Sequence, residues 1–134
     1  MSRRLTEVRF QIKIADLGYA RELTHGTFAN SACGTPLLVA PELILRKFYD
    51  HKIDVWGIAN IFYTLLTGKL LFDGQTKEYD EQLEEGVWKF PCEVKISAEA
   101  LKFLHDLLQY DPNKRLSINE LVSHPYLNMP LDKL

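Results

Sequence analysis

The feature that most constrains the fold is a run of apolar residues between Asp54 and Gly68. Its first apolar face follows helical spacing: Val55, Ile58, Ala59, Phe62, Leu65 and Leu66. The positions between them are apolar as well: Trp56, Ile61 and Tyr63. A helix that is apolar nearly all round is buried, so we expect this helix to lie at the centre of the core. Asp54 is predicted to cap its N-terminus, and Gly68 to end it in a left-handed conformation.

A strand and a long loop are predicted before this helix. Residues 8–14 alternate between apolar and polar side chains, which is typical of a half-buried strand. The strand is expected to end near Asp16 and Gly18. Residues 19–36 have no sustained period and are rich in Thr, Ser, Gly and Asn, which indicates a loop. Loops of this length within a compact domain usually have a function.

Three further helices are predicted in the second half of the chain. A weaker, acidic segment spans about residues 75–85. Ser97 is expected to cap the next helix, whose inner side we assign to four leucines: Leu101, Leu104, Leu107 and Leu108. Ser117 and Glu120 form a capping-box pattern, which opens a short last helix that ends near His124. The pattern as a whole predicts a mostly helical domain.

Composition excludes several classes of protein. The 134 residues suit one domain, and a net charge of −2 gives no basic footprint for nucleic acid. The first four residues, two of them arginines, have no apolar run behind them and do not form a signal peptide, and the longest apolar stretch is too interrupted for membrane insertion. The two cysteines and four histidines show no metal-ligand spacing. We expect an intracellular, cytoplasmic location.

Four motifs follow one another along the chain. Lys13–Arg21 contains an Asp-Leu-Gly triplet, and Cys33–Glu42 closes on Ala-Pro-Glu. Asp54–Ala59 reads Asp-Val-Trp-Gly-Ile-Ala, and Leu107–Arg115 is followed by His124–Pro125. In this order and spacing they resemble the C-terminal lobe of a eukaryotic Ser/Thr protein kinase catalytic domain. Leu in place of the usual Phe of the first motif, and Gly and Ala in place of Ser and Gly in the third, depart from the family pattern.

The resemblance runs from about residue 10 to residue 127 and implies a fold class. This class is mainly α, within an α+β family: a protein-kinase-like C-lobe with a short β-strand or ribbon at its N-terminal end and a long activation-segment loop. Residues 1–134 would then form a single partial domain. Its activation segment would span about residues 16–42, and its C-lobe helices about residues 43–127.

The resemblance also implies roles for individual residues. Asp16 corresponds to the family's Mg²⁺ ligand, a hard oxygen donor that holds the metal against the ATP phosphates. Glu42 and Arg115 correspond to a buried ion pair, which we interpret as a structural staple. Asp54 and Trp56 correspond to the residues that anchor the central helix in the family. Asp54 contacts the catalytic loop in the family, but we favour a capping role for it in this chain.

Other implied roles fall on the activation segment. Ser31, with Thr27 and Thr24 nearby, lies where Ser/Thr kinases carry an activating phosphate. Because the usual arginine receptor belongs to a loop outside these residues, we favour unmodified hydroxyls. A second set corresponds to the substrate-binding loop: Thr35, Pro36 and Leu38.

The groups that transfer phosphate are missing from the sequence. Its seven glycines form no G-x-G-x-x-G pattern, and no Val-Ala-Ile-Lys strand is present. The 15 residues before Asp16 contain no His-Arg-Asp and no Asn, and their only carboxylate is Glu7. Because phosphoryl transfer depends on these groups together, we predict that the chain alone binds no cofactor and is inactive, although the family implies ATP and Mg²⁺.

Three interpretations remain open. The first is a pseudokinase-like C-lobe module that acts by protein–protein binding. The second is a fragment of an active ATP-dependent Ser/Thr kinase whose N-lobe and catalytic loop lie outside this chain. The third is a structural subunit of a large assembly. All three require a protein partner or a complementing N-lobe.

Overall fold

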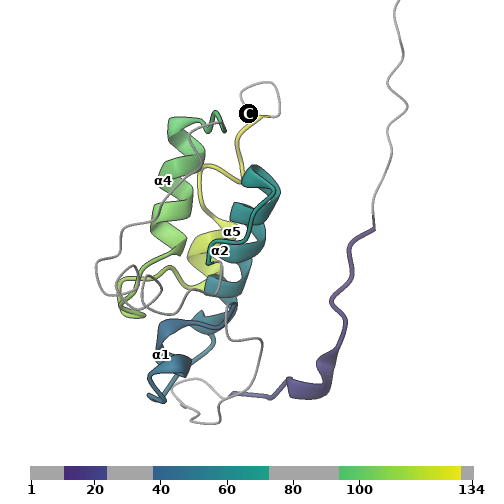
Figure 1. Ribbon diagram of the computed structural model, residues 1–134, viewed down its shortest axis with the longest axis vertical. Coiled ribbons are helices and arrows are strands. Elements are labelled where there is room, and N and C mark those ends of the chain that lie inside the picture. The colour runs from purple at the N-terminus through teal and green to yellow at the C-terminus, as the bar shows by residue number, and fades with distance from the viewer. Residues whose placement is uncertain (1–10, 24–37, 73–93, 131–134) are drawn as a thin grey trace, which may run out of the picture.

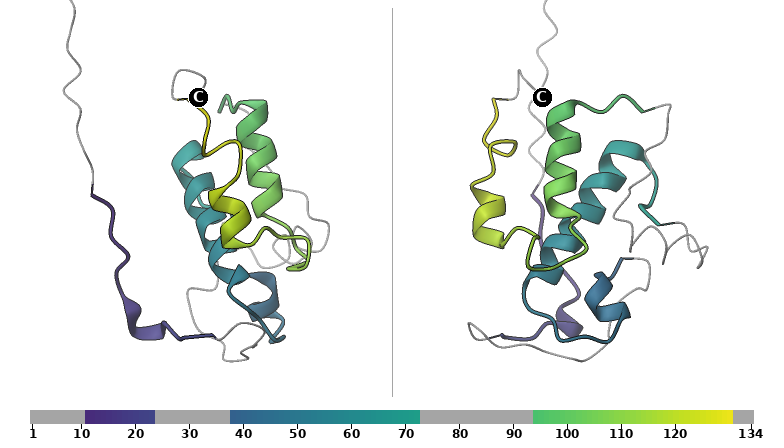
Figure 2. Two further views of the ribbon diagram at one scale, coloured as in Figure 1. Left: turned by 180° about the vertical axis from the view of Figure 1, so that it is seen from behind. Right: turned by 90° about the vertical axis from the view of Figure 1, so that its left-hand side faces the viewer.

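The structure, a computed structural model, describes residues 11–23, 38–72 and 94–130 (Figure 1). These residues form a 3-10 turn, η1 (Leu17–Tyr19), and four α-helices: α1 (Pro41–Ile44), α2 (Lys52–Thr67), α4 (Ala98–Leu107) and α5 (Ile118–Val122). Helix α2 packs against both α4 and α5, and α1 lies beyond its N-terminal end (Figures 1 and 2). The predicted helix over residues 75–85 lies outside the described residues.

Helix α2 begins three residues earlier than predicted. It starts at Lys52, whose backbone N–H donates to Asp50 Oδ1 over 2.8 Å. Asp54 lies in the first turn, exposed to solvent, so its predicted role as the N-cap is wrong. The prediction failed because the helix starts before Asp54, with Asp50 accepting the N–H of its first residue. The other end is as expected: Gly68 has φ 68° and donates its N–H to the Thr64 carbonyl.

Only one side of α2 is buried. The buried side consists of Val55, Trp56, Ala59, Asn60 and Tyr63. On the other side, Ile61 is 63% exposed and Leu65 is 78% exposed. The prediction of a helix buried nearly all round is therefore wrong, and Leu65 does not belong to the inner face to which we assigned it. Within the described residues, the core covers one face of α2 and leaves the other open.

Helix α4 supplies the other half of the core. The Ser97 side chain accepts the Ala100 N–H over 3.2 Å, as the sequence predicts. Leu104, Leu107 and Leu108 are buried as expected, whereas Leu101 is 37% exposed, so its assignment to the inner side is wrong. Phe103, which the leucine pattern overlooked, is only 1% exposed and takes the inner position.

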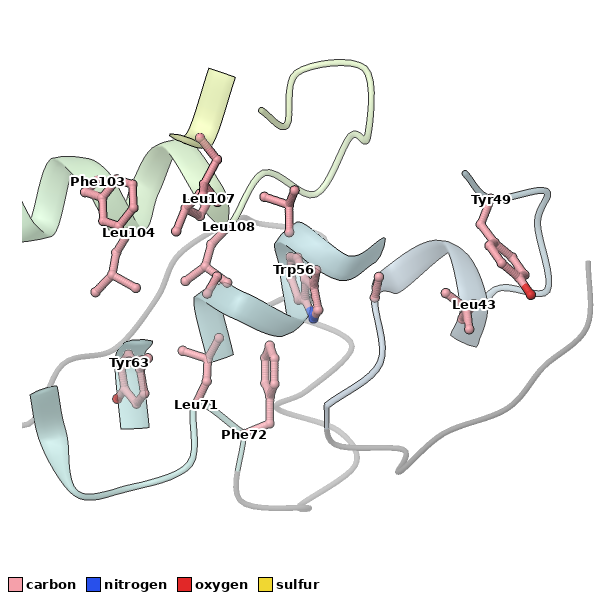
Figure 3. Close-up of a cluster of buried hydrophobic side chains, with 14 residues drawn as sticks. Leu43, Tyr49, Trp56, Tyr63, Leu71, Phe72, Phe103, Leu104, Leu107 and Leu108 are labelled. Carbon is pink, nitrogen blue, oxygen red and sulfur yellow. The ribbon is translucent and has the colours of Figure 1, made fainter. Parts of the chain in front are cut away.

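The core packs around Trp56, which is fully buried. Its ring stacks on that of Phe72, with centroids 6.2 Å apart (Figure 3). A second aromatic group joins α2 to α4 and to the segment after α5: Phe103 lies 5.2 Å from Phe62 and 4.9 Å from Tyr126, measured between ring centroids. Aromatic pairs of this kind contribute about 0.5–1.5 kcal/mol beyond their burial.

Helix α5 opens with the predicted capping box. The Ser117 N–H donates to Glu120 Oε2 over 2.7 Å, and the Glu120 N–H donates to Ser117 Oγ over 3.3 Å. Two of the free N–H groups at this helix end are thereby satisfied. The helix ends at Val122, close to the predicted boundary.

The predicted N-terminal strand is not present in its described part. Residues 11–14 have no regular structure, and Ile12 and Ile14 are 92% and 89% exposed. This segment runs apart from the helices (Figure 1). A strand needs a neighbour to satisfy its backbone groups, and no described segment pairs with this one. The expectation of a half-buried strand is therefore wrong for residues 11–14.

Candidate functional site

Asp16 has an unusual backbone conformation. Its φ of 58° and ψ of 63° are left-handed, and η1 follows directly, closed by the Ala20 N–H donating to the Leu17 carbonyl over 3.0 Å. Aspartate tolerates this conformation better than most residues. Backbone strain of this kind gathers at functional sites, where surrounding structure maintains it.

Asp16 does not form a metal site with the other described residues. Its side chain is exposed, and no group of three His, Cys, Asp or Glu residues in the described ranges could hold a metal ion. Mg²⁺ in nucleotide sites is bound by one or two carboxylates together with phosphate oxygens and water. Asp16 is a suitable oxygen ligand in type, but the described residues do not complete a site around it.

Glu42 and Arg115 form a buried ion pair between α1 and the turn before α5. Arg115 Nη1 donates to Glu42 Oε1 over 2.7 Å, and Nη2 donates to Oε2 over 3.0 Å. Both side chains are almost fully buried. This geometry matches the ion pair that the resemblance implies.

Arg115 also binds groups that the sequence did not point to. Its Nε donates to the Gln109 carbonyl over 3.0 Å, and Nη1 donates to the Lys52 carbonyl over 3.1 Å. Its guanidinium lies 5.0 Å from the centroid of the Trp56 ring, within the range of a cation–π contact. Arg115 thus ties α1, the start of α2 and its own turn to the central tryptophan.

Lys52 adds a second link at the same place. Its ammonium donates to the Pro112 carbonyl over 2.8 Å, joining the first residue of α2 to the turn that carries Arg115. Nothing in the sequence marked Lys52, because a lysine that binds a distant carbonyl has no local pattern.

The substrate-loop candidates are only partly described. Leu38 is 41% exposed and leads into Ala40, which is buried just before α1. Thr35 and Pro36 lie outside the described residues, as do the three phosphate-site candidates: Ser31, Thr27 and Thr24. Their roles remain predictions.

The open face of α2 is the feature that sequence reasoning missed. At 100° per residue, Ile61 and Leu65 lie on the same side of the helix as Asp54. Ile58, next to them, is half-buried. We call these four residues the open face of α2. It lies opposite Tyr63, which is only 3% exposed. Asp54, the acidic residue at the start of this face, was the one sequence signal that the face is exposed. We missed it because we had assigned Asp54 to a helix cap.

A polar pair joins α4 to the segment after α5. Asp106 Oδ2 accepts from Lys102 Nζ over 2.5 Å and lies 3.4 Å from His124 Nε2. Partial burial alone would raise the pKa of Asp106, but the hydrogen bonds and charges of Lys102 and His124 outweigh it and hold the pKa below its ordinary value. His124 Nδ1 accepts the Tyr126 N–H, so the neutral ring carries its proton on Nε2, facing Asp106.

The sequence matches the protein kinase domain family over residues 5–127, nearly the whole chain. The chain belongs to this family. The kinase-like ion pair and helices described above fall within the matched range. The family as a whole uses ATP and Mg²⁺, although the structure contains no ligand.

The relatives that the chain matches include Ser/Thr protein kinases. The chain is 37% identical over 123 residues to the probable serine/threonine-protein kinase fhkC of Dictyostelium discoideum, covering 87% of this chain and 21% of that protein. It is 33% identical over 119 residues to serine/threonine-protein kinase D2 of Homo sapiens, covering 87% of this chain and 13% of that kinase. The chain therefore spans about a fifth or less of the length of these relatives.

Among the residues that the structure describes, no helix is both long enough and apolar enough to cross a membrane.

Proposed function

We propose that these 134 residues form a kinase-derived C-lobe module that acts by binding protein through the open face of α2. The observation that carries the proposal is the exposure of Ile61 and Leu65, at 63% and 78%, on the helix whose other side forms the core. Two large apolar side chains one turn apart, beside the half-buried Ile58, form an apolar stripe on the central helix of the domain.

Covering this stripe would be favourable. Full burial of an isoleucine or leucine side chain contributes roughly 1.5–3 kcal/mol relative to exposure. The exposed carboxylate of Asp54, at the N-terminal end of the stripe, offers an acceptor for backbone N–H groups of the partner. An apolar stripe that ends in a charged acceptor supports a polypeptide partner better than a small ligand.

The same observations support a second candidate, in which the partner is the remainder of an active Ser/Thr kinase domain. The exposed and extended segment with Ile12 and Ile14 alternates as a strand does, and it lacks a described strand to pair with. Asp16 keeps a strained backbone next to it, at the position of the family's Mg²⁺ ligand. Both features favour a partner that supplies a strand and the rest of a nucleotide site.

In either case these 134 residues are proposed to be inactive by themselves. Asp16 is the one family metal ligand that we identify in the sequence, and the catalytic Asp and Asn have no counterpart before it. Titration calorimetry of the chain with ATP and Mg²⁺ tests this directly. We expect no binding at millimolar ATP, and micromolar affinity would contradict the proposal.

The binding proposal is tested on the chain purified from its native host, with native mass spectrometry as the readout. We expect the wild-type chain in a stoichiometric protein complex that the double variant Ile61→Glu, Leu65→Glu loses. Val122→Glu is the matched control, because Val122 is as exposed as Ile61, at 63%, but lies on α5. A wild-type monomer, or a double variant that keeps the complex, would contradict the proposal.

The identity of the captured protein separates the two candidates. A partner whose sequence contains a glycine-rich loop and a His-Arg-Asp motif supports the second candidate. A partner without these motifs supports the first. ATP binding by the isolated complex gives an independent readout of the same distinction.

A further inference from the structure

The apolar stripe on the open face of α2 is nearly symmetric about its own midpoint. Ile58 and Leu65 lie at equal distances from the point between positions 61 and 62, and Ile61 lies next to that point. Asp54 lies four residues before Ile58, and Lys69 lies four residues after Leu65. The stripe therefore has the same apolar spacing from either end, with an acidic residue at one end and a basic residue at the other.

Both terminal charges are available to a partner. Asp54 and Lys69 are exposed, and neither forms an ion pair with another residue in the part of the chain that the structure describes. Lys69 directly follows Gly68, which caps the C-terminal end of α2. Its N–H donates to Thr67 Oγ1 over 3.2 Å, which fixes its backbone close to the helix end.

A second copy of α2 running in the opposite direction matches this pattern. In an antiparallel pair with a two-fold axis at the midpoint, Ile58 lies opposite Leu65 of the second copy, and the two Ile61 side chains meet near the axis. Asp54 then lies opposite Lys69 of the second copy, and this pair occurs twice. A parallel pair would place Asp54 against Asp54 and Lys69 against Lys69, so the charges favour the antiparallel direction.

Gly57 leaves room for a second helix beside the stripe. At 100° per residue, it lies on the flank of the open face next to Ile61. Apart from its chain neighbours and the backbone of its own helix, no described atom lies within 4 Å of the place that a Cβ would take. Glycine costs a helix about 0.5–1 kcal/mol relative to alanine, but it lets another backbone approach closely.

We propose that the protein covering the open face of α2 is a second copy of this chain, bound by antiparallel packing of the two α2 helices. This inference rests on the proposed function, because it names the partner of the same face. The two apolar stripes cover each other, and two Asp54–Lys69 ion pairs set the direction and the register. A single pair of helices buries less than the roughly 1,200 Å² of a standard interface, so the dimer is weak, with a Kd of about 10–100 µM.

Sedimentation equilibrium of the full chain, from about 1 µM to 1 mM, tests the proposal. Asp54→Lys and Lys69→Asp each replace both attractive pairs by repulsive ones, so each should weaken dimerisation about 5–30-fold. Glu99→Lys and Lys114→Asp are the matched controls. They make the same charge changes at exposed positions outside the open face, and should leave the dimer unchanged.

The charge swap Asp54→Lys, Lys69→Asp in one chain is the decisive variant. It keeps the net charge of the wild type and restores both attractive pairs of the antiparallel dimer, so it should dimerise about as tightly as the wild type. Positions 54 and 69 are about 22 Å apart along one helix, so this rescue requires contact between two copies. Rescue also shows that the weakened single variants had not simply lost their fold.

The proposal is overturned if the wild type remains monomeric at about 1 mM, if the charge swap fails to restore dimerisation, or if Ile61→Glu, Leu65→Glu leaves the dimer intact. The proposed function is judged separately, on the chain from its native host. A complex with a different protein, lost in the same Ile61→Glu, Leu65→Glu variant, would overturn self-association and leave the proposed function standing. A chain that is monomeric in both experiments would contradict both.

Discussion

Arg115 and Glu42, which are 73 residues apart in sequence, meet through two parallel hydrogen bonds of 2.7 and 3.0 Å in the protein interior. The planar guanidinium matches the two carboxylate oxygens, and its remaining donors bind the carbonyls of Gln109 and Lys52. Arg115 thus joins α1, the start of α2 and the turn before α5. The pair links α1 to the turn before α5 in this protein kinase family chain.

Replacing Arg115 by lysine should destabilise the chain almost as much as replacing it by alanine. One ammonium cannot form the parallel pair with Glu42 and also reach both carbonyls. We expect a loss of roughly 3–5 kcal/mol for Arg115→Ala, because Glu42 is left as an unpaired buried charge. Chemical denaturation followed by Trp fluorescence measures both variants.

The double variant Glu42→Leu, Arg115→Met is the control for this prediction. Removing both charges avoids the buried unpaired carboxylate, so the double variant should be more stable than Arg115→Ala alone. It should still be less stable than the wild type, because the Gln109 and Lys52 carbonyls lose their donor. An unchanged melting temperature for Arg115→Ala would contradict the role of the pair.

The capping box of α5 gives a smaller and more local prediction. Ser117→Ala removes the side-chain acceptor of the Glu120 N–H and should cost about 1 kcal/mol. Ser123→Ala, at the other end of the same helix, changes an exposed serine and should be neutral. Thermal unfolding of the two variants side by side distinguishes a capping effect from a general loss of hydroxyl contacts.

Local features of this kind could be predicted from the sequence. Ser97, Ser117 and Gly68 end or begin helices through bonds to residues three or four positions away, so the sequence around each contains the whole interaction. The Glu42–Arg115 pair came from the resemblance to kinases instead, because a contact across 73 residues has no local pattern.

The errors concern features that depend on a neighbour elsewhere in the chain. Asp54 matched the pattern of a cap, but the helix begins at Lys52, whose N–H donates to Asp50 instead. Ile61 and Leu65 are as apolar as their buried neighbours, and periodicity cannot say which side of a helix has something to pack against. Residues 11–14 alternate like a strand, but a strand forms only with a partner.

Acid should weaken the contact between α4 and the segment after α5. The pKa of Asp106 is held below its ordinary value of about 3.8, so its charged form is stabilised in the folded state. This contribution is fully present above pH 3.8 and is lost as the pH falls through the lower folded-state pKa. Asp106→Asn should therefore be less stable than the wild type at pH 7, by about 0.5–1 kcal/mol.

The pH dependence separates this effect from simple loss of packing. Below the folded-state pKa of Asp106 the wild-type carboxyl is neutral, so the difference between wild type and Asp106→Asn should vanish. Urea unfolding at a series of pH values measures the difference. A constant difference down to the lowest pH at which the chain folds would contradict the electrostatic explanation.

The open face of α2 should tolerate charge without loss of stability. Ile61→Glu and Leu65→Glu change side chains that are largely exposed, so each should alter the free energy of unfolding by less than about 0.5 kcal/mol. Ala59→Glu, on the buried side of the same helix, should unfold the chain. Circular dichroism during urea unfolding measures all three. Large destabilisation by Ile61→Glu would mean that residue 61 is part of the core.

The central claim is that a protein partner covers the open face of α2, and a photo-crosslinking amino acid at position 65 tests it most directly. Irradiated in the native host, the chain should form one dominant crosslinked species with a second polypeptide. The same amino acid at position 122, on the exposed side of α5, should not form it. Absence of a crosslink at position 65, or an identical product from both positions, would contradict the account.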